Sequence, residues 1–140
     1  NRMAVAHKGA GAFIDGQRLD VSKKNTTPKD MKFYAGGAQA WHFEPVKGLV
    51  GEIVNVRCAL HDFMNFYAGD ADGVVHVNKL TPWDHAANVL IAQESGAYVG
   101  INNAEAYDPA VYGPGFLIAA PSKESWDQAY PILFPLLNRH

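Results

Sequence analysis

One acid, Asp84, occupies the place in this sequence where chemistry is easiest to assign. It lies near the start of Leu80 to Gly100, a segment that predicts a helix ending near Gly96 and then a strand. Thr81 is a favourable N-cap, Pro82 suits the first helical position, and an acid at Asp84 fits a capping box. On spacing alone, Asp84 is therefore a capping residue that needs no metal ion.

Other reactive residues give weaker signals. Cys58 precedes a predicted helix, where thiol pKa values fall, but Val-Arg-Cys-Ala-Leu-His is not the Cys-x5-Arg loop of cysteine phosphatases. The Gly9-Ala10-Gly11 run lacks the helix and the Lys-Ser/Thr pair of a phosphate loop, so we expect a turn or bulge. Four histidines show no metal-ligand spacing and are expected to be surface or satisfied core residues: His42, His61, His85 and His140.

The composition is that of an ordinary soluble globular domain, with 140 residues, 48% of them hydrophobic and 19% charged. A net charge of −2 gives no reason to expect nucleic acid or an anionic membrane as a partner. No apolar run approaches the roughly 20 residues that span a bilayer. The single cysteine excludes an internal disulfide and fits a cytoplasmic location. Without an initiator Met, the sequence begins as if within a strand, so we expect part of a longer protein.

The order of predicted elements indicates an α/β fold with a mostly parallel sheet flanked by helices. Residues 3–22 read as a β-hairpin, and the polar run 23–30 is the best candidate boundary. The later elements are strands at 31–34, 51–56, 72–77, 97–99 and 116–120, helical turns at 38–43, and helices at 59–68, 81–96 and from residue 122.

In such sheets, sites form where strands end and helix N-termini point. Two loops qualify, Val56 to Ala59 and Lys79 to Asp84. We expect Trp83 to wedge between its helix and the sheet and so to fix the direction of Asp84. Glu94, at the negative end of the same helix, is expected to be solvated. Five residues at helical spacing predict the buried face of this helix: Trp83, Ala86, Ala87, Leu90 and Ile91.

The sequence Pro-Trp-Asp-His-Ala-Ala at 82–87, followed by Glu-Ser-Gly at 94–96, resembles the WDxAAG…EAGG signature of the inositol monophosphatase family. Residues 9–13 and 57–72 resemble two further family blocks, a strand pair and a GSAALDLCYVAAGRAD helix. In the helix block the matching positions are Ala59, Asp62, Ala68, Gly69, Ala71 and Asp72. The resemblance covers nearly the whole chain but only the second half of the family fold.

The resemblance implies a magnesium-dependent, lithium-sensitive phosphatase of inositol or sugar phosphate monoesters, acting through metal-activated water. The full family fold is an αβαβα sandwich. Residues 1–25 would be a β-hairpin remnant of the N-terminal α+β domain, and residues 26–140 the C-terminal α/β domain. Most metal-binding carboxylates of the family come from an N-terminal half with a DPxDGT-like motif, which this sequence lacks. Asp84 matches the metal-binding Asp of WDxAA, and Mg²⁺ prefers such oxygen ligands.

The resemblance also implies partners: a small phosphorylated polyol or sugar, the missing N-terminal half, and a second copy in a homodimer. Thr81 and Trp83 would support Asp84 from outside the metal shell. Substrate would face Arg57, Cys58 and Ala59 at the start of one helix, and His76, which aligns with the family's substrate-binding Glu.

Three of these positions depart from the family pattern. Arg57 and Cys58 replace a Gly-Ser/Thr pair, so a thiol stands where a hydroxyl donor is usual and an anion-binding guanidinium is added. With a partly protonated His76, this favours a bisphosphate or an acidic sugar phosphate. A related bisphosphatase, a histidinol-phosphate or nucleotide phosphatase, and a non-catalytic domain stay open as alternatives. For the 140-residue chain alone we expect no phosphatase activity.

Overall fold

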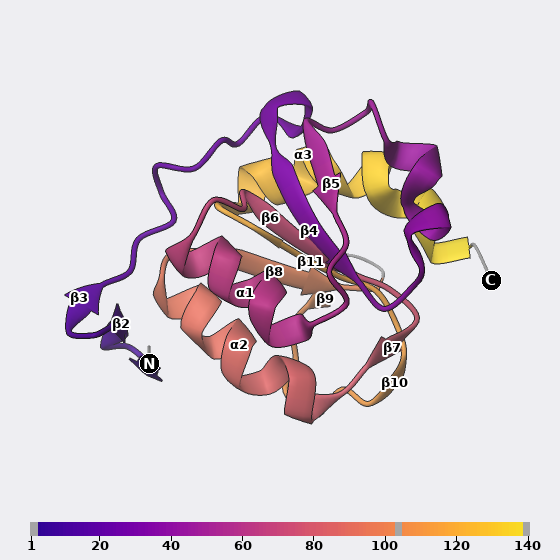
Figure 1. Ribbon diagram of the computed structural model, residues 1–140. Coiled ribbons are helices and arrows are strands. Elements are labelled where there is room, and N and C mark those ends of the chain that lie inside the picture. Colours follow the sequence, from indigo (N-terminus) through magenta and orange to yellow (C-terminus); the bar gives the residue numbers. More distant parts are fainter. Residues whose placement is uncertain (1–2, 103–104, 139–140) are drawn as a thin grey trace.

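The computed structural model describes residues 3–102 and 105–138 (Figure 1). Its strands are β1 (Ala4–His7), β2 (Gly11–Ile14), β3 (Gln17–Arg18), β4 (Lys32–Gly36), β5 (Glu52–Val54), β6 (Gly73–His76), β7 (Lys79–Leu80), β8 (Tyr98–Ile101), β9 (Glu105–Ala106), β10 (Gly113–Pro114) and β11 (Leu117–Ala120). Its helices are α1 (Ala59–Ala68), α2 (Pro82–Glu94) and α3 (Lys123–Leu133), with 3-10 segments η1 (Pro28–Asp30), η2 (Ala40–Val46) and η3 (Phe134–Asn138).

The main sheet has six strands in the order β5-β4-β6-β11-β8-β9. Strand β4 pairs parallel with β5 and β6, whereas β11 pairs antiparallel with β6 and β8. Strands β5, β4, β6 and β8 therefore run in one direction, and β11 and β9 run in the other. The reversal at β11 follows from its connection, because the chain returns from β8 without a crossover helix. The predicted α/β class is confirmed, with a mixed sheet.

The two faces of this sheet carry different helices. Helices α1 and α2 lie side by side on one face, and α3 lies on the other (Figure 1). Side chains alternate along each strand, so Val74 packs among the α1 and α2 residues while Val75 packs among those of α3. His76 shares the parity of Val74 and therefore points toward α1 and α2.

The N-terminal strands form a separate sheet in the order β1-β2-β3, which packs against α2. The predicted turn at Gly9 to Gly11 is confirmed, and both glycines have left-handed φ angles, +83° and +91°. Glu94 of α2 accepts the N–H of Gly9 at 3.0 Å and that of Gly11 at 2.8 Å. These backbone donors lower the pKa of the Glu94 carboxyl. The expectation that Glu94 is merely solvated is wrong, because its carboxylate holds the hairpin on α2.

Helix boundaries follow the sequence closely, but the buried face of α2 does not. Helix α1 spans the predicted residues 59–68, and Ser122 caps α3 through a capping box with Ser125. The predicted helical turns at 38–43 form the 3-10 segment η2. Of the five predicted core residues of α2, only Ile91 is buried, because the helix is rotated so that His85, Val89 and Ala92 also face inward. Among the described helices, none combines the length and apolar character needed to cross a membrane.

Candidate functional site

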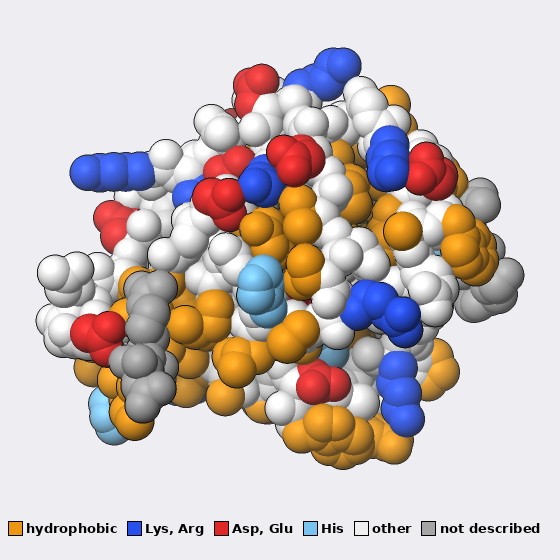
Figure 2. All heavy atoms as spheres, in the orientation of Figure 1, with side chains coloured by type: hydrophobic (Ala, Val, Ile, Leu, Met, Phe, Trp, Pro, Cys, Tyr) orange, Lys and Arg blue, Asp and Glu red, His pale blue; other side chains and the backbone are white. Residues whose placement is uncertain are grey.

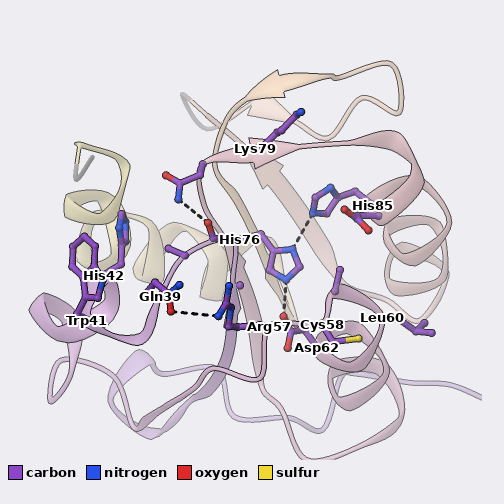
Figure 3. A pocket seen from close by; sticks show the side chains of 16 residues that line it. Gln39, Trp41, His42, Arg57, Cys58, Leu60, Asp62, His76, Lys79 and His85 are labelled. Atoms are coloured by element: carbon purple, nitrogen blue, oxygen red, sulfur yellow. Dashed lines mark hydrogen bonds and ion pairs between the residues drawn. The ribbon is translucent and has the colours of Figure 1, made fainter.

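A pocket of about 820 Å³ opens where β4 and β6 end, beside the first turns of α1 and α2 (Figure 3). The structure therefore brings together the two loops predicted from the sequence. Arg57, Cys58 and Ala59 come from one loop, and Lys79 and Asp84 come from the other. The remaining lining residues are Gly36, Gly37, Ala38, Gln39, Trp41, His42, Leu60, Asp62, His76, Asn78 and His85.

Asp84 is exposed in the pocket wall and is held on one side only. The Thr81 hydroxyl donates to Asp84 Oδ2 at 2.9 Å, whereas Asp84 Oδ1 has no hydrogen bond within residues 3–102 and 105–138. Thr81 is the N-cap of α2 by backbone position, but its hydroxyl does not cap the helix. The expected capping box is therefore absent, because this hydroxyl orients the carboxylate instead. One carboxylate oxygen stays available for a cation.

Trp83 does not wedge between α2 and the sheet, so that expectation is wrong. Its side chain is 72% exposed and lies against Tyr112, with ring centroids 5.5 Å apart. Figure 2 shows hydrophobic side chains gathered over the lower part of the molecule, where α2 begins, with Lys and Arg side chains over the neighbouring β7–β10 pair. The buried position under the helix start belongs to His85, two residues later, which is 3% exposed.

Asp62, His76 and His85 form a buried chain of hydrogen bonds under the pocket (Figure 3). His76 Nε2 lies 2.8 Å from Asp62 Oδ2, and His76 Nδ1 lies 2.9 Å from His85 Nε2. Both nitrogens of the predicted substrate ligand His76 are therefore engaged within the protein. Only the carbon edge of its ring is left for a bound molecule.

His85 is neutral at physiological pH. Burial and, to a smaller extent, the neighbouring His76 lower the pKa of its imidazole from 6.5 to about 4, against the opposing effects of the Thr81 carbonyl and the Asp84 carboxylate. A neutral imidazole has one N–H, so one ring nitrogen donates and the other accepts. The backbone of Thr81 meets His85 Nδ1 with both its N–H, at 3.2 Å, and its carbonyl, at 3.0 Å.

The start of α1 presents positive charge and free N–H groups to the pocket. Arg57 has a left-handed φ of +61°, a sparsely populated conformation for a residue with a side chain, and donates to Gln39 Oε1 at 3.4 Å. Cys58 is the N-cap, is exposed and free, and makes no side-chain cap. The first amides of α1 are therefore uncapped, and with Arg57 and Lys79 they provide an environment for an anion.

Asp84 does not belong to a complete cluster of metal ligands in the part of the chain that the structure describes. Within it, no group of three or more His, Cys, Asp or Glu side chains is placed to hold a metal ion. The free Oδ1 of Asp84 is the kind of hard oxygen donor that Mg²⁺ takes. The chain therefore offers one suitable ligand but not a complete metal site.

The sequence assigned no role at this site to Asp62 or Lys79. It predicted His85 to be a surface or satisfied core residue, and the burial and hydrogen bonds of His85 confirm the latter. A signal existed for His85, since it lies four residues after Thr81 and so returns to the same side of the helix start. Asp62 entered only as a match to a family block. Its approach to His76 depends on how α1 packs on β6, which no local pattern specifies. His140 lies outside the described residues.

Comparisons with known proteins give the following likenesses. The model of the family described as "Inositol monophosphatase family" matches residues 1–132. A fructose-1,6-bisphosphatase/inositol-1-monophosphatase of Thermococcus kodakarensis is 32% identical over 98 residues, covering 67% of this chain and 36% of that protein. The IMPase of Thermotoga maritima superposes with a TM-score of 0.80 at 22% identity, over 97% of this chain and 52% of that one. An IMPase/NADP phosphatase complexed with Mg²⁺ and phosphate superposes with a TM-score of 0.74 at 21% identity, over 94% of this chain and 49% of that one. The chain thus spans about half or less of each relative.

Proposed function

The chain belongs to the inositol monophosphatase family, and on this premise we propose that it forms the C-terminal half of a magnesium-dependent phosphatase. Its substrates are inositol or sugar phosphates. The observation that carries the proposal is Asp84, held by Thr81 through Oδ2 and free at Oδ1, in a pocket that also contains the uncapped start of α1.

Asp84 is the proposed metal ligand of this half. When bound, Mg²⁺ supplies Lewis-acid activation of a phosphoryl oxygen and lowers the pKa of a bound water. Thr81 holds the carboxylate so that its free oxygen is presented to the pocket. Because no group of three or more metal-ligating side chains occurs in the described chain, we propose that the other carboxylates come from an N-terminal half. Relatives that are about twice as long have room for such a half.

A partly exposed apolar face of α2 supports this proposal. A groove of about 600 Å³ runs along α2 beside the hairpin and is lined by Ala86, Ala87, Leu90 and Tyr107. Three of them, Ala86, Ala87 and Leu90, belong to the face of the helix that the sequence predicted to be buried. We propose that the N-terminal half covers this groove, and that residues 1–25 belong structurally to that half.

The substrate's phosphate is proposed to bind at the start of α1, against the first amides and near Arg57, Cys58 and Ala59. Arg57 and Lys79 add two cationic side chains to the same pocket. Two cations beside an uncapped helix N-terminus suit a substrate with a second anionic group. A bisphosphate or an acidic sugar phosphate is therefore favoured over a monophosphate of a neutral ring. His76 contributes the carbon edge of its ring to the pocket wall.

The test measures phosphate release by the form of the protein that carries both halves, with and without Mg²⁺ and with a chelator. The panel contains inositol 1-phosphate, fructose 1,6-bisphosphate and an acidic sugar phosphate. We expect Mg²⁺-dependent hydrolysis, and Arg57→Gln should raise KM for the bisphosphate about tenfold while leaving the neutral-ring monophosphate within about twofold. Phosphate release at an unchanged rate in the presence of the chelator would contradict the proposed metal-dependent chemistry. Preference for the neutral-ring monophosphate contradicts the substrate class.

The rival function is a non-catalytic domain that binds phosphorylated ligands. It is distinguished by the same assay, since such a domain would bind substrate in the presence of Mg²⁺ without releasing phosphate. For the 140-residue chain alone, we expect no hydrolysis above background, because a single carboxylate ligand cannot assemble the metal site.

A further inference from the structure

We propose that Asp62, His76 and His85 form a buried positioning relay that holds Thr81, and through Thr81 the Asp84 carboxylate, in place. The relay joins three elements, with Asp62 on α1, His76 at the end of β6, and His85 on α2. The inference rests on the proposed function, in that Asp84 is taken as the metal ligand whose direction matters. None of the three relay residues needs to touch the metal or the substrate.

The contacts of the relay form one path with a consistent direction of donation. We assign the tautomers from the Asp62 end, where the carboxylate is the acceptor, so that His76 Nδ1 accepts from His85 Nε2–H over 2.9 Å. His85 Nδ1 then accepts the Thr81 N–H over 3.2 Å and does not donate to the Thr81 carbonyl, which lies 3.0 Å away. His76 Nε2–H donates in turn to Asp62 Oδ2 over 2.8 Å. Each imidazole carries one N–H in this arrangement, and every donor of the path has an acceptor.

The path continues from Thr81 to the pocket. The Thr81 carbonyl accepts the amide N–H groups of Asp84 and His85, at 3.2 and 3.1 Å, as the first helical bonds of α2. The Thr81 hydroxyl donates to Asp84 Oδ2 at 2.9 Å. A helix N-cap is a place where helices fray, because its backbone bonds are few. Fixing Thr81 through its N–H therefore fixes the residue that orients Asp84.

The surroundings prevent the relay from rearranging. Phe63 lies edge-on to both imidazoles, with centroid separations of 5.5 Å to His76 and 6.3 Å to His85. A Cβ atom at Gly36 would lie 3.0 Å from both Asp62 Oδ2 and His76 Nε2, so this glycine lets β4 close over the pair. The ring planes and the carboxylate are thus locked by packing.

Burying Asp62 lowers the stability of the fold more than an apolar residue with only a packing role would. Its side chain is fully buried, and its Oδ1 has no hydrogen-bond partner in residues 3–102 and 105–138. A buried carboxylate with one unpaired oxygen destabilises a fold, and apolar side chains of similar size stabilise it more. Unsatisfied buried groups of this kind are expected at functional positions, which agrees with a positioning role.

The test uses NMR on the ¹⁵N-labelled chain. In the unaltered chain, the relay predicts that His76 and His85 are each protonated on Nε2, with ring N–H protons shielded from solvent. A variant without the central link, His76→Leu, should accelerate amide exchange of Thr81 at least tenfold while core amides of β11 change less than twofold. Ser95→Ala, which removes another buried hydrogen bond of α2 far from the pocket, should leave Thr81 exchange unchanged. His85→Asn, whose amide can still meet the Thr81 backbone, should restore part of the protection lost in His85→Leu.

A second readout connects the relay to the metal ligand. Mn²⁺ titrated into the form of the protein that carries both halves should broaden the amide signals around Asp84, and His76→Leu in that form should require about tenfold more Mn²⁺ for the same broadening. Unchanged Thr81 exchange and unchanged Mn²⁺ dependence in His76→Leu would overturn the relay. So would an Nδ1-protonated His85 in the unaltered chain, a result that needs no variant to fold. Absence of Mn²⁺ broadening near Asp84 in the unaltered protein that carries both halves would instead contradict the proposed function, so the two failures are distinguishable.

Discussion

The buried, neutral His85 predicts a loss of stability in mild acid. In the folded chain the pKa of His85 is about 4, whereas in the unfolded chain it returns to about 6.5. Above pH 6.5 both states hold His85 neutral, so this residue contributes no pH dependence. As the pH falls from 6.5 toward 4, the unfolded state gains a proton that the folded state does not. The free energy of unfolding therefore falls.

The size of the effect follows from these two pKa values. Linkage between 6.5 and about 4 lowers the free energy of unfolding by about 2 kcal/mol between pH 7 and pH 5. His85 is 3% exposed, so solvent screening reduces this little. The carboxyl groups whose pKa is lowered in the fold, such as Asp70 beside Lys32, stay ionised in this interval and contribute little to the slope.

The assay is urea unfolding of the chain, followed by circular dichroism at pH 7, 6 and 5. His85→Leu should flatten the pH dependence by about 2 kcal/mol relative to the unaltered chain, whatever its stability at pH 7. Ser95→Ala changes a buried polar residue of the same helix without removing a titrating group, so its slope should match the unaltered chain. A His85→Leu slope equal to that of the unaltered chain would refute the assignment of a buried neutral His85.

Three further predictions concern packing and positioning. Gly100→Ala should lower the free energy of unfolding by about 1–3 kcal/mol, because its Cβ would lie 2.5 Å from the Trp126 ring; a loss below about 0.5 kcal/mol in urea unfolding would contradict this packing. Glu94→Ala should accelerate amide exchange of the two glycines in the β1–β2 turn, which its carboxylate holds; unchanged exchange rates would show that the hairpin docks without it. Thr81→Val, which removes only the hydroxyl bonded to Asp84, should weaken Mn²⁺ binding by the protein that carries both halves about tenfold and should lower the free energy of unfolding by about 1 kcal/mol or less. Equal Mn²⁺ binding in the valine variant would mean that this hydroxyl does not orient the carboxylate.

Local signals predicted the helices and the place of the pocket. Periodicity predicted α1 at 59–68, and Thr81 with Pro82 predicted the start of α2, because caps and apolar spacing are properties of neighbouring residues. The two loops that meet at the pocket were also predictable, since the carboxyl ends of parallel strands share one edge of a sheet.

The rotation of α2 was not predictable from its own residues. Small and large apolar side chains occur on more than one side of this helix, so its apolar residues do not single out one buried face. Trp83 was therefore expected inside and lies outside, whereas the polar His85 lies inside. A buried histidine on an inward face is stable only because His76 and the Thr81 backbone satisfy its nitrogens.

The relay could not be predicted because its members come from three separate elements. Alternation along β6 places His76 on the α1 and α2 side once the sheet faces are known. The approach of Asp62 depends on where α1 crosses that strand, which tertiary packing decides. The resemblance to the family identified Asp84 as a metal-ligand position, but it did not identify the buried residues that hold this carboxylate in place.

We propose that Asp84 binds the catalytic magnesium ion in the protein that carries both halves. The most direct measurement is the rate of Mg²⁺-dependent phosphate release by Asp84→Asn, beside Asp127→Asn, which alters an exposed acid of α3 paired with Lys123. We expect Asp84→Asn to lower the rate at least about 100-fold with an unchanged fold, and Asp127→Asn to stay within about twofold of the unaltered protein. Near-normal activity of Asp84→Asn at ordinary Mg²⁺ concentrations would contradict this proposal.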